Sequence, residues 1–189
     1  MENDGITDHI RAREEEHFRK KDRELIEKLR QADAAAKARE ALEQEAGVHD
    51  PEVLRELEQL GFTPGTLPLL PLIPVLQVAW ANEGISTAER TLLLNLARAR
   101  GIRAGTAADA LLHQWLERPP SKDTFLKANR LIAAIVDSPL TGALHVSGKE
   151  LVEQCDAIAH ASGGIFGIGR VSAEERAALE EIAAAVKRT

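Results

Sequence analysis

The residues of this 189-residue chain that are best suited to bind a metal ion lie in one short segment. Glu83 and Glu89 supply two carboxylates separated by five residues, and Asn82 adds a side-chain amide oxygen. Hard divalent cations such as calcium and magnesium require several oxygen ligands of this kind. Asn82, Glu83 and Glu89 are therefore the best metal-binding candidates in the chain, and a divalent-metal-responsive domain is kept as an alternative function. No other cofactor is indicated by the sequence.

Glu89 also has a structural interpretation, because it ends a Ser-x-x-Glu pattern that begins at Ser86. In such a capping box the Ser oxygen accepts a hydrogen bond from the Glu N–H, and the Glu carboxylate accepts one from the Ser N–H. The same pattern recurs at Ser172 and Glu175 ahead of another apolar stretch. The repeat predicts two related helix–loop–helix units.

No combination of residues in the sequence indicates a catalytic centre. Cys155, the single cysteine, lies on an apolar stripe without a nearby base in the sequence, which favours a buried small hydrophobe over a nucleophile. The glycine-rich segment 163–169 matches neither the dinucleotide fingerprint nor the phosphate-binding loop of nucleotidases. It is either a connection between helices or an apolar contact loop in which Phe166 binds a partner. We therefore expect a non-enzymatic protein.

The N-terminal segment from about residue 8 to residue 45 is highly charged and contains neither Pro nor Gly. Opposite charges repeatedly lie four residues apart, a spacing that stabilises a solvated helix. Its apolar residues do not form a continuous heptad repeat. Two interpretations stay open: a solvated helix, or a recognition arm that binds a protein partner through Phe18, Leu25, Ile26 and Leu29. A second copy of the chain is also a candidate partner, through pairing of this helix.

The overall composition favours an all-α fold. Hydrophobic residues make up 44% of the chain, but only 3% are aromatic, and Ala and Leu dominate. Both are strong helix formers and neither is a typical strand residue. The net charge of −6 argues against a nucleic-acid-binding protein, which normally has a basic face. One cysteine excludes an internal disulfide and a zinc site built from several cysteines.

The longest apolar run, residues 67–81, is too short to span a bilayer. It contains three prolines, and we expect a buried helix whose first turns hold them. No transmembrane segment is predicted. No apolar signal segment follows Met1, so the expected location is the cytoplasm.

Turn and capping residues divide the chain into three parts. Residues 1–47 form the charged helical arm, which Gly47 ends. Residues 48–65 form a short amphipathic helix and a linker, with Asp50 as the predicted N-cap. Residues 66–189 form the helical domain with the two helix–loop–helix units. The predicted architecture is an all-α bundle of about six or seven helices with a long charged N-terminal helix.

The segment VAWANEGISTAERTLLLNLA, residues 78–97, resembles the signature of the tellurite-resistance TerB family, in which this unit usually reads Ala-Asp-Gly-x-Val/Ile-Ser-x-x-Glu. Asn82 stands where the family has Asp, and Glu83 where it has Gly. The identities are Ala81, Ile85, Ser86 and Glu89. The resemblance covers about residues 66–187. It implies a TerB-like helical bundle, a role in stress or tellurite resistance, and metal binding at the acidic loop.

Residues 13–29 of the arm also resemble the inhibitory segment of the mitochondrial ATPase inhibitor family, through Arg-Glu-Glu-Glu-His-Phe-Arg and Glu-Leu-Ile-Glu-Lys-Leu. This resemblance implies an alternative function, in which the arm inhibits an ATPase.

Overall fold

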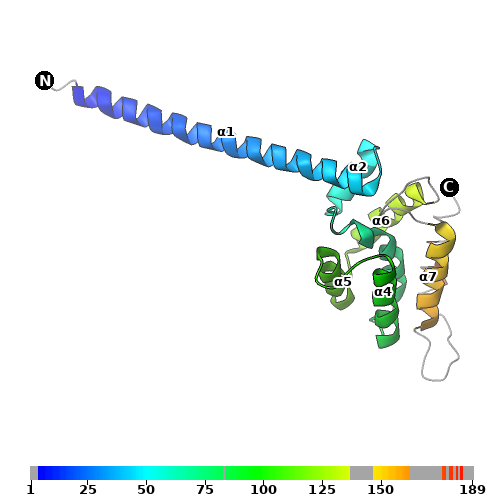
Figure 1. Cartoon of the computed structure of the whole chain (residues 1–189). Coiled ribbons are helices and arrows are strands. Elements are labelled where there is room, and N and C mark those ends of the chain that lie inside the picture. Colours follow the sequence, from blue (N-terminus) through cyan, green and yellow to red (C-terminus); the bar gives the residue numbers. More distant parts are fainter. Residues whose placement is uncertain are drawn as a thin grey trace. The chain divides into compact units, whose positions relative to one another are not determined.

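The computed structural model describes residues 4–82, 84–136 and 147–161, together with residues 176, 177, 179, 180, 182 and 184. Every regular element in this part of the chain is helical, which confirms the predicted all-α fold (Figure 1). Seven α-helices and one 3₁₀ helix are described, in agreement with the expected number. The chain divides into two compact units, Met1–Glu40 and Ala41–Thr189.

The first unit consists of most of helix α1, Asp4–Ala46, which has 43 residues and is coloured blue in Figure 1. At about 1.5 Å per residue, the whole helix is about 65 Å long. Every side chain from residue 16 to residue 40 is exposed. Pairs four residues apart stabilise it, such as Lys37 Nζ with Asp33 Oδ2 at 2.8 Å. The expected long charged helix is therefore present.

The last turn of α1 belongs to the second unit, because its apolar side chains are buried there. Leu42 is 2% exposed and Ala46 is fully buried. Gly47 then ends the helix with a φ of 64°, a conformation that favours glycine. The unit boundary thus falls after residue 40, whereas the sequence pattern placed the end of the arm after residue 47.

Side-chain caps fix the starts of the helices in the second unit. They precede α2 (Pro51–Gln59), α4 (Thr87–Ala99), α5 (Ala107–Glu117) and α6 (Lys122–Ile135). The caps are Asp50, Ser86, Thr106 and Ser121, each accepting a backbone N–H two or three residues ahead. Before α7 (Gly148–Ala161), the Ser147 hydroxyl accepts from the Glu150 N–H at 3.4 Å.

The apolar segment 67–81 differs from the single helix that we expected. It forms a 3₁₀ helix, η1 (Leu67–Leu72), followed by the short helix α3 (Ile73–Ala79). Pro71 lies inside η1 and Pro74 near the start of α3. Proline lacks an N–H and its ring clashes with the carbonyl four residues earlier, so the prolines disfavour a regular α-helix here. The segment is nevertheless buried along almost its whole length.

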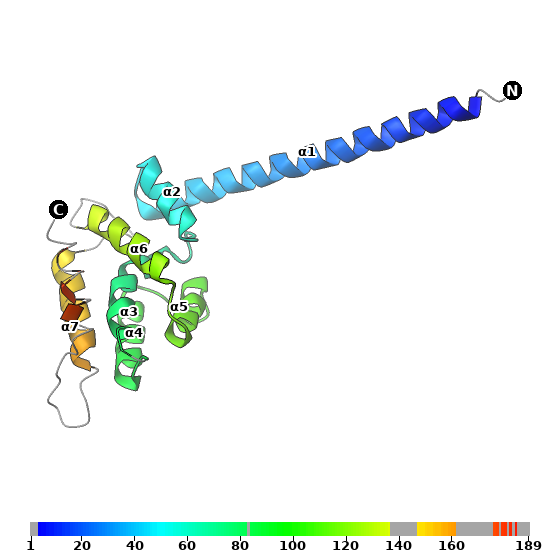
Figure 2. The same cartoon turned by 180° about the vertical axis from the view of Figure 1, so that it is seen from behind.

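The η1–α3 segment is the centre of the bundle. Helix α3 packs against α4, α6 and α7, and η1 packs against α4, α5 and α6. Helix α7 runs alongside α3 and α4 (Figure 2). The inward faces of the outer helices carry buried apolar residues at helical spacing, for example Phe125, Ala128, Ile132 and Ile135 of α6 and Leu151, Cys155, Ile158 and Ala159 of α7.

The predicted second helix–loop–helix unit lies largely outside the described residues. The second helix–loop–helix unit depends on residues 162–175, and the structure describes none of these. In the part that it does describe, no helix is both long enough and apolar enough to cross a bilayer.

We predict that Leu76→Ala lowers the free energy of unfolding by about 2–5 kcal/mol, because Leu76 is fully buried in α3 and its loss leaves a cavity. The matched control is Leu126→Ala in α6, where the leucine is 50% exposed and the expected change is within about 0.5 kcal/mol. Urea unfolding of both variants measures this. Equal losses of stability would contradict the central role of α3.

Candidate interaction site

The four apolar residues that the sequence nominated for partner binding are all exposed on α1. Phe18 is 64% exposed, Leu25 56%, Ile26 48% and Leu29 61%. Since each helical residue advances by about 100°, Phe18, Leu25 and Leu29 point within about 40° of one another, and Ile26 flanks them. We call these four residues the apolar stripe.

The apolar stripe stands out from the rest of the described surface. Five large hydrophobic side chains are exposed in the described residues, and the fifth is Leu126 of α6. Single exposed apolar residues are normal, but a contiguous group bordered by charges is typical of an interaction site. Arg23, Glu24, Glu27 and Lys28 lie between or beside the apolar positions. The stripe can therefore bury apolar area against a partner while its charged border sets the orientation.

The nominated metal ligands are only partly described. Asn82 is exposed in the connection between α3 and α4, and Glu83 lies outside the described residues. Glu89 is 1% exposed in the first turn of α4.

Glu89 makes the predicted capping box. Its Oε2 accepts from the Ser86 N–H at 2.7 Å, and its own N–H donates to Ser86 Oγ at 3.2 Å. Its other oxygen, Oε1, is buried and has no hydrogen-bond partner among the described residues. A buried carboxylate oxygen without a partner is destabilising. The cap thus engages one carboxylate oxygen, Oε2, and leaves Oε1 without a hydrogen bond from the described residues.

Two hydrogen bonds fix the ends of the α3–α4 connection to the end of α5. Trp80 Nε1 donates to the Trp115 carbonyl at 2.9 Å, and Arg90 Nη2 donates to the Leu116 carbonyl at 2.8 Å. Both acceptors lie in the last turn of α5, where helix carbonyls lack intrahelical partners. The loop that carries Asn82 is therefore held at both ends by tertiary contacts.

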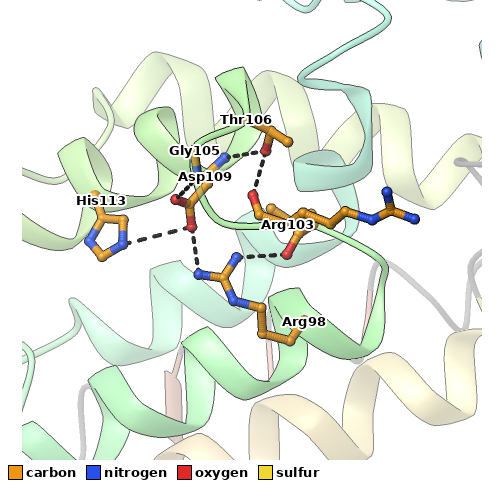
Figure 3. A network of polar contacts seen from close by, with 7 residues as sticks. Arg98, Arg103, Gly105, Thr106, Asp109 and His113 are labelled. Atoms are coloured by element: carbon orange, nitrogen blue, oxygen red, sulfur yellow. Dashed lines mark hydrogen bonds and ion pairs between the residues drawn. The ribbon is translucent and has the colours of Figure 1, made fainter.

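A polar network that was not predicted from the sequence joins α4 and α5 (Figure 3). Arg98 donates to Asp109 Oδ1 at 2.8 Å and to the Ile102 carbonyl at 2.7 Å. The Gly105 N–H donates to Asp109 Oδ2 at 2.9 Å, and His113 Nε2 lies 3.8 Å from Oδ1. Both oxygens of Asp109 are engaged, so the network holds the connection between the helices and offers no free base. The signals were Asp109 three residues after the Thr106 cap and Arg98 in the last turn of α4.

The network lowers the pKa of the Asp109 carboxyl below its usual value of 3.8. The largest cause is the hydrogen bond from the Gly105 N–H, followed by the hydrogen bond from Arg98. Both donors favour the ionised carboxylate.

Two further sequence predictions concern Cys155 and Phe166. Cys155 is fully buried on α7, and burial raises the pKa of its thiol to about 12. The thiol is therefore protonated and unreactive at neutral pH, which confirms that it packs as a small hydrophobe. Phe166 lies outside the described residues.

Comparison of the chain with protein-family models, with curated proteins and with solved structures finds no match. The TerB and ATPase-inhibitor resemblances therefore stay predictions from the sequence. Among the described residues, no three His, Cys, Asp or Glu side chains are grouped as metal ligands, a search that does not include Glu83.

We predict that Asp109→Asn destabilises the protein at neutral pH. The pKa of Asp109 is lower in the folded state than in the unfolded state, so the carboxylate stabilises the fold above about pH 4 and loses this effect as the pH falls through the lowered value. The deficit of the variant relative to the parent should accordingly shrink in acid. Urea unfolding at a series of pH values measures it.

Asp123→Asn is the control, since Asp123 pairs with Lys127 on the exposed surface of α6. Its effect should be small at every pH. A deficit for Asp109→Asn that stays constant down to strong acid would contradict the stabilising role of the carboxylate.

Proposed function

We propose that this chain is a non-enzymatic, cytoplasmic protein-interaction module in which the apolar stripe of α1 is the binding surface. The observation that carries the proposal is the exposure of Phe18, Leu25, Ile26 and Leu29 on one face of an otherwise charged helix. An amphipathic helix of this kind binds by laying its apolar face against a partner.

The energetics favour association through the stripe. Fully burying one Leu or Phe side chain stabilises a complex by about 1.5–3 kcal/mol before the entropic cost of association is subtracted. α1 is already helical, so the exposed residues lose little backbone entropy on binding.

Charge helps to define the class of partner. Both signs alternate along α1, as in Arg23 with Glu24 and Glu27 with Lys28, and the whole chain carries −6. A nucleic-acid-binding helix would concentrate basic residues on one face. The mixed charges favour a protein surface with its own alternating charges. The TerB resemblance supports a role in stress or tellurite resistance, and the ATPase-inhibitor resemblance names an ATPase as an alternative partner class.

The test is an affinity pull-down that compares the full-length protein with the double variant Leu25→Asp/Leu29→Asp. We expect partners of the parent protein to be lost, because two buried carboxylates would replace apolar contacts. Leu126→Asp is the control, as it makes one substitution of the same kind at an exposed leucine of α6, and it should retain the partners.

Both variants should keep the circular dichroism spectrum and melting temperature of the parent, which shows that the fold is intact. The same set of captured proteins for the parent and the double variant would contradict a binding role for the stripe.

One observation favours a second function, a divalent-metal-responsive domain. Glu89 Oε1 is buried without a hydrogen-bond partner among the described residues, and this oxygen could instead coordinate a cation. Glu83 and the Asn82 amide are the nearest ligands in the sequence. Hard cations suit such an oxygen-only set.

This second function predicts that calcium, magnesium or zinc raises the melting temperature of the protein, since an ion that binds only the folded state stabilises it. The double variant Glu83→Gln/Glu89→Gln should show no such shift. Because the substitution also alters the cap, each variant is compared with itself in the presence of a chelator. A parent protein that shows no shift with any of the three ions would rule this function out.

A further inference from the structure

We propose that the partner of the apolar stripe is a second copy of the same chain, paired in parallel and in register along residues 18–36 of α1. This inference rests on the proposed function and specifies the partner that binds the apolar stripe. The observations that carry it are the spacing of the exposed apolar residues and the charges beside them.

The spacing defines a short seam of the kind that pairs two helices. Steps of four and three residues alternate from Phe18 through Asp22, Leu25, Leu29 and Ala32 to Ala36, and all six positions are exposed. A repeat of seven residues keeps such a seam facing a partner helix when the two helices supercoil. Phe18 and the two leucines supply the apolar contacts, and the alanines allow close approach. The seam is interrupted at one position, Asp22.

The charges beside the seam favour a parallel pair. In a parallel coiled coil, the residue just before the first inner position of each heptad, here Asp22 or Leu29, faces the residue five places further along the other helix. This rule places Lys28 opposite Asp33 of the second copy, and the arrangement occurs twice because the pair is symmetric. Asp33 already pairs with Lys37 on its own helix, but both side chains are solvated, so that pair contributes little and Asp33 can be shared.

The other flanking position is apolar. Lys21 faces Ile26 of the second copy, and the methylene groups of the lysine can cover the isoleucine while the ammonium group stays in water. Ile26, which lies at the edge of the stripe, thereby becomes part of the interface. All four stripe residues are accounted for in the parallel arrangement.

An antiparallel pair is disfavoured by the same residues. When Leu25 faces Leu29 of the second copy in an antiparallel pair, Lys28 lies opposite Lys28 of that copy. Like charges at these positions select against that orientation.

Asp22 is the polar residue inside the seam. A polar residue at a single inner position fixes the register of a coiled coil and lowers its stability. In the parallel pair it lies beside Lys21 of the second copy, which offsets part of the repulsion between the two aspartates. We therefore expect a weak, concentration-dependent dimer.

Disulfide cross-linking tests the register and the orientation. In the parallel pair, residue 25 faces residue 25, so Leu25→Cys should form a covalent dimer in mild oxidant, within the distance that a disulfide requires. Glu27→Cys is the control, because Glu27 lies on the opposite side of α1 and is equally solvated. The native Cys155 gives no background, since it is fully buried.

Selective cross-linking of Leu25→Cys supports the parallel pair. Equal cross-linking of both variants shows random collision and overturns it. If Leu25→Cys does not cross-link, the parallel, in-register pair is overturned, and this result also covers a chain that dimerises in the antiparallel orientation.

Sedimentation of the full-length protein is the second measurement. From about 1 µM to about 1 mM, mass action should raise the apparent mass from the monomer value toward twice that value. The monomer mass is 20.6 kDa. Leu25→Asp/Leu29→Asp should remain at the monomer mass throughout, and Leu126→Asp should behave as the parent.

The two proposals can fail separately. A parent protein that stays monomeric over the whole range overturns self-pairing. If that monomer still captures a different protein through the stripe, the proposed function stands with another occupant. If the stripe variants change neither mass nor capture, both proposals fail.

Discussion

The burial of the proline-containing segment 67–79 is the constraint on which the rest of the bundle depends. Pro68, Pro71 and Pro74 remove three backbone donors, so the segment has fewer polar groups to satisfy when it is taken out of water. Its leucines, isoleucine and valines then present apolar surface on all sides, and four other helices cover it. The outer helices can therefore be amphipathic, with one buried face each, because they pack around a segment in which Gln77 is the one polar residue.

Hydrogen bonds at the helix ends add to the packing around this apolar centre. Capping side chains accept hydrogen bonds from N–H groups in the first turns of α2, α4, α5 and α6. At the other end of α5, the side chains of Trp80 and Arg90 donate hydrogen bonds to backbone carbonyls. Arg98 and Asp109 fix the connection from α4 to α5 in the same way. Apolar burial supplies the driving force, and the polar groups determine where each helix begins and how it is oriented. Glu89 is a polar group that is itself buried: one carboxylate oxygen caps α4, and the other has no hydrogen-bond partner among the described residues.

Helix α1 is stabilised in a different way from the helices of the bundle. Between residues 16 and 40 its side chains are exposed, so its helical state depends on local propensity and on pairs four residues apart. Such a helix needs no apolar residue for its own formation. Phe18, Leu25, Ile26 and Leu29 contribute nothing to the burial of the bundle core, and their exposure on one face is the observation that supports the proposed association with another surface.

The sequence by itself determined the features that depend on neighbouring residues. Ser86 with Glu89, Asp50 before Pro51, and Gly47 after α1 could all be predicted, because caps and helix ends involve residues within a few positions of one another. The helical period also indicates which apolar residues of α6 and α7 face inward, whereas for the arm the sequence named Phe18, Leu25, Ile26 and Leu29 as candidate contacts and left a solvated helix open.

Only the tertiary structure decided the features that join distant residues. The bond from Trp80 to the Trp115 carbonyl spans 35 positions and that from Arg90 to the Leu116 carbonyl spans 26, and no local pattern specifies such pairs. The break of segment 67–81 into η1 and α3 also required the structure, since propensity alone does not say how prolines are accommodated in a buried segment. The role of Leu42 and Ala46 in the core of the second unit is of the same kind: burial is a property of the packed chain, and the sequence shows only that a residue is apolar.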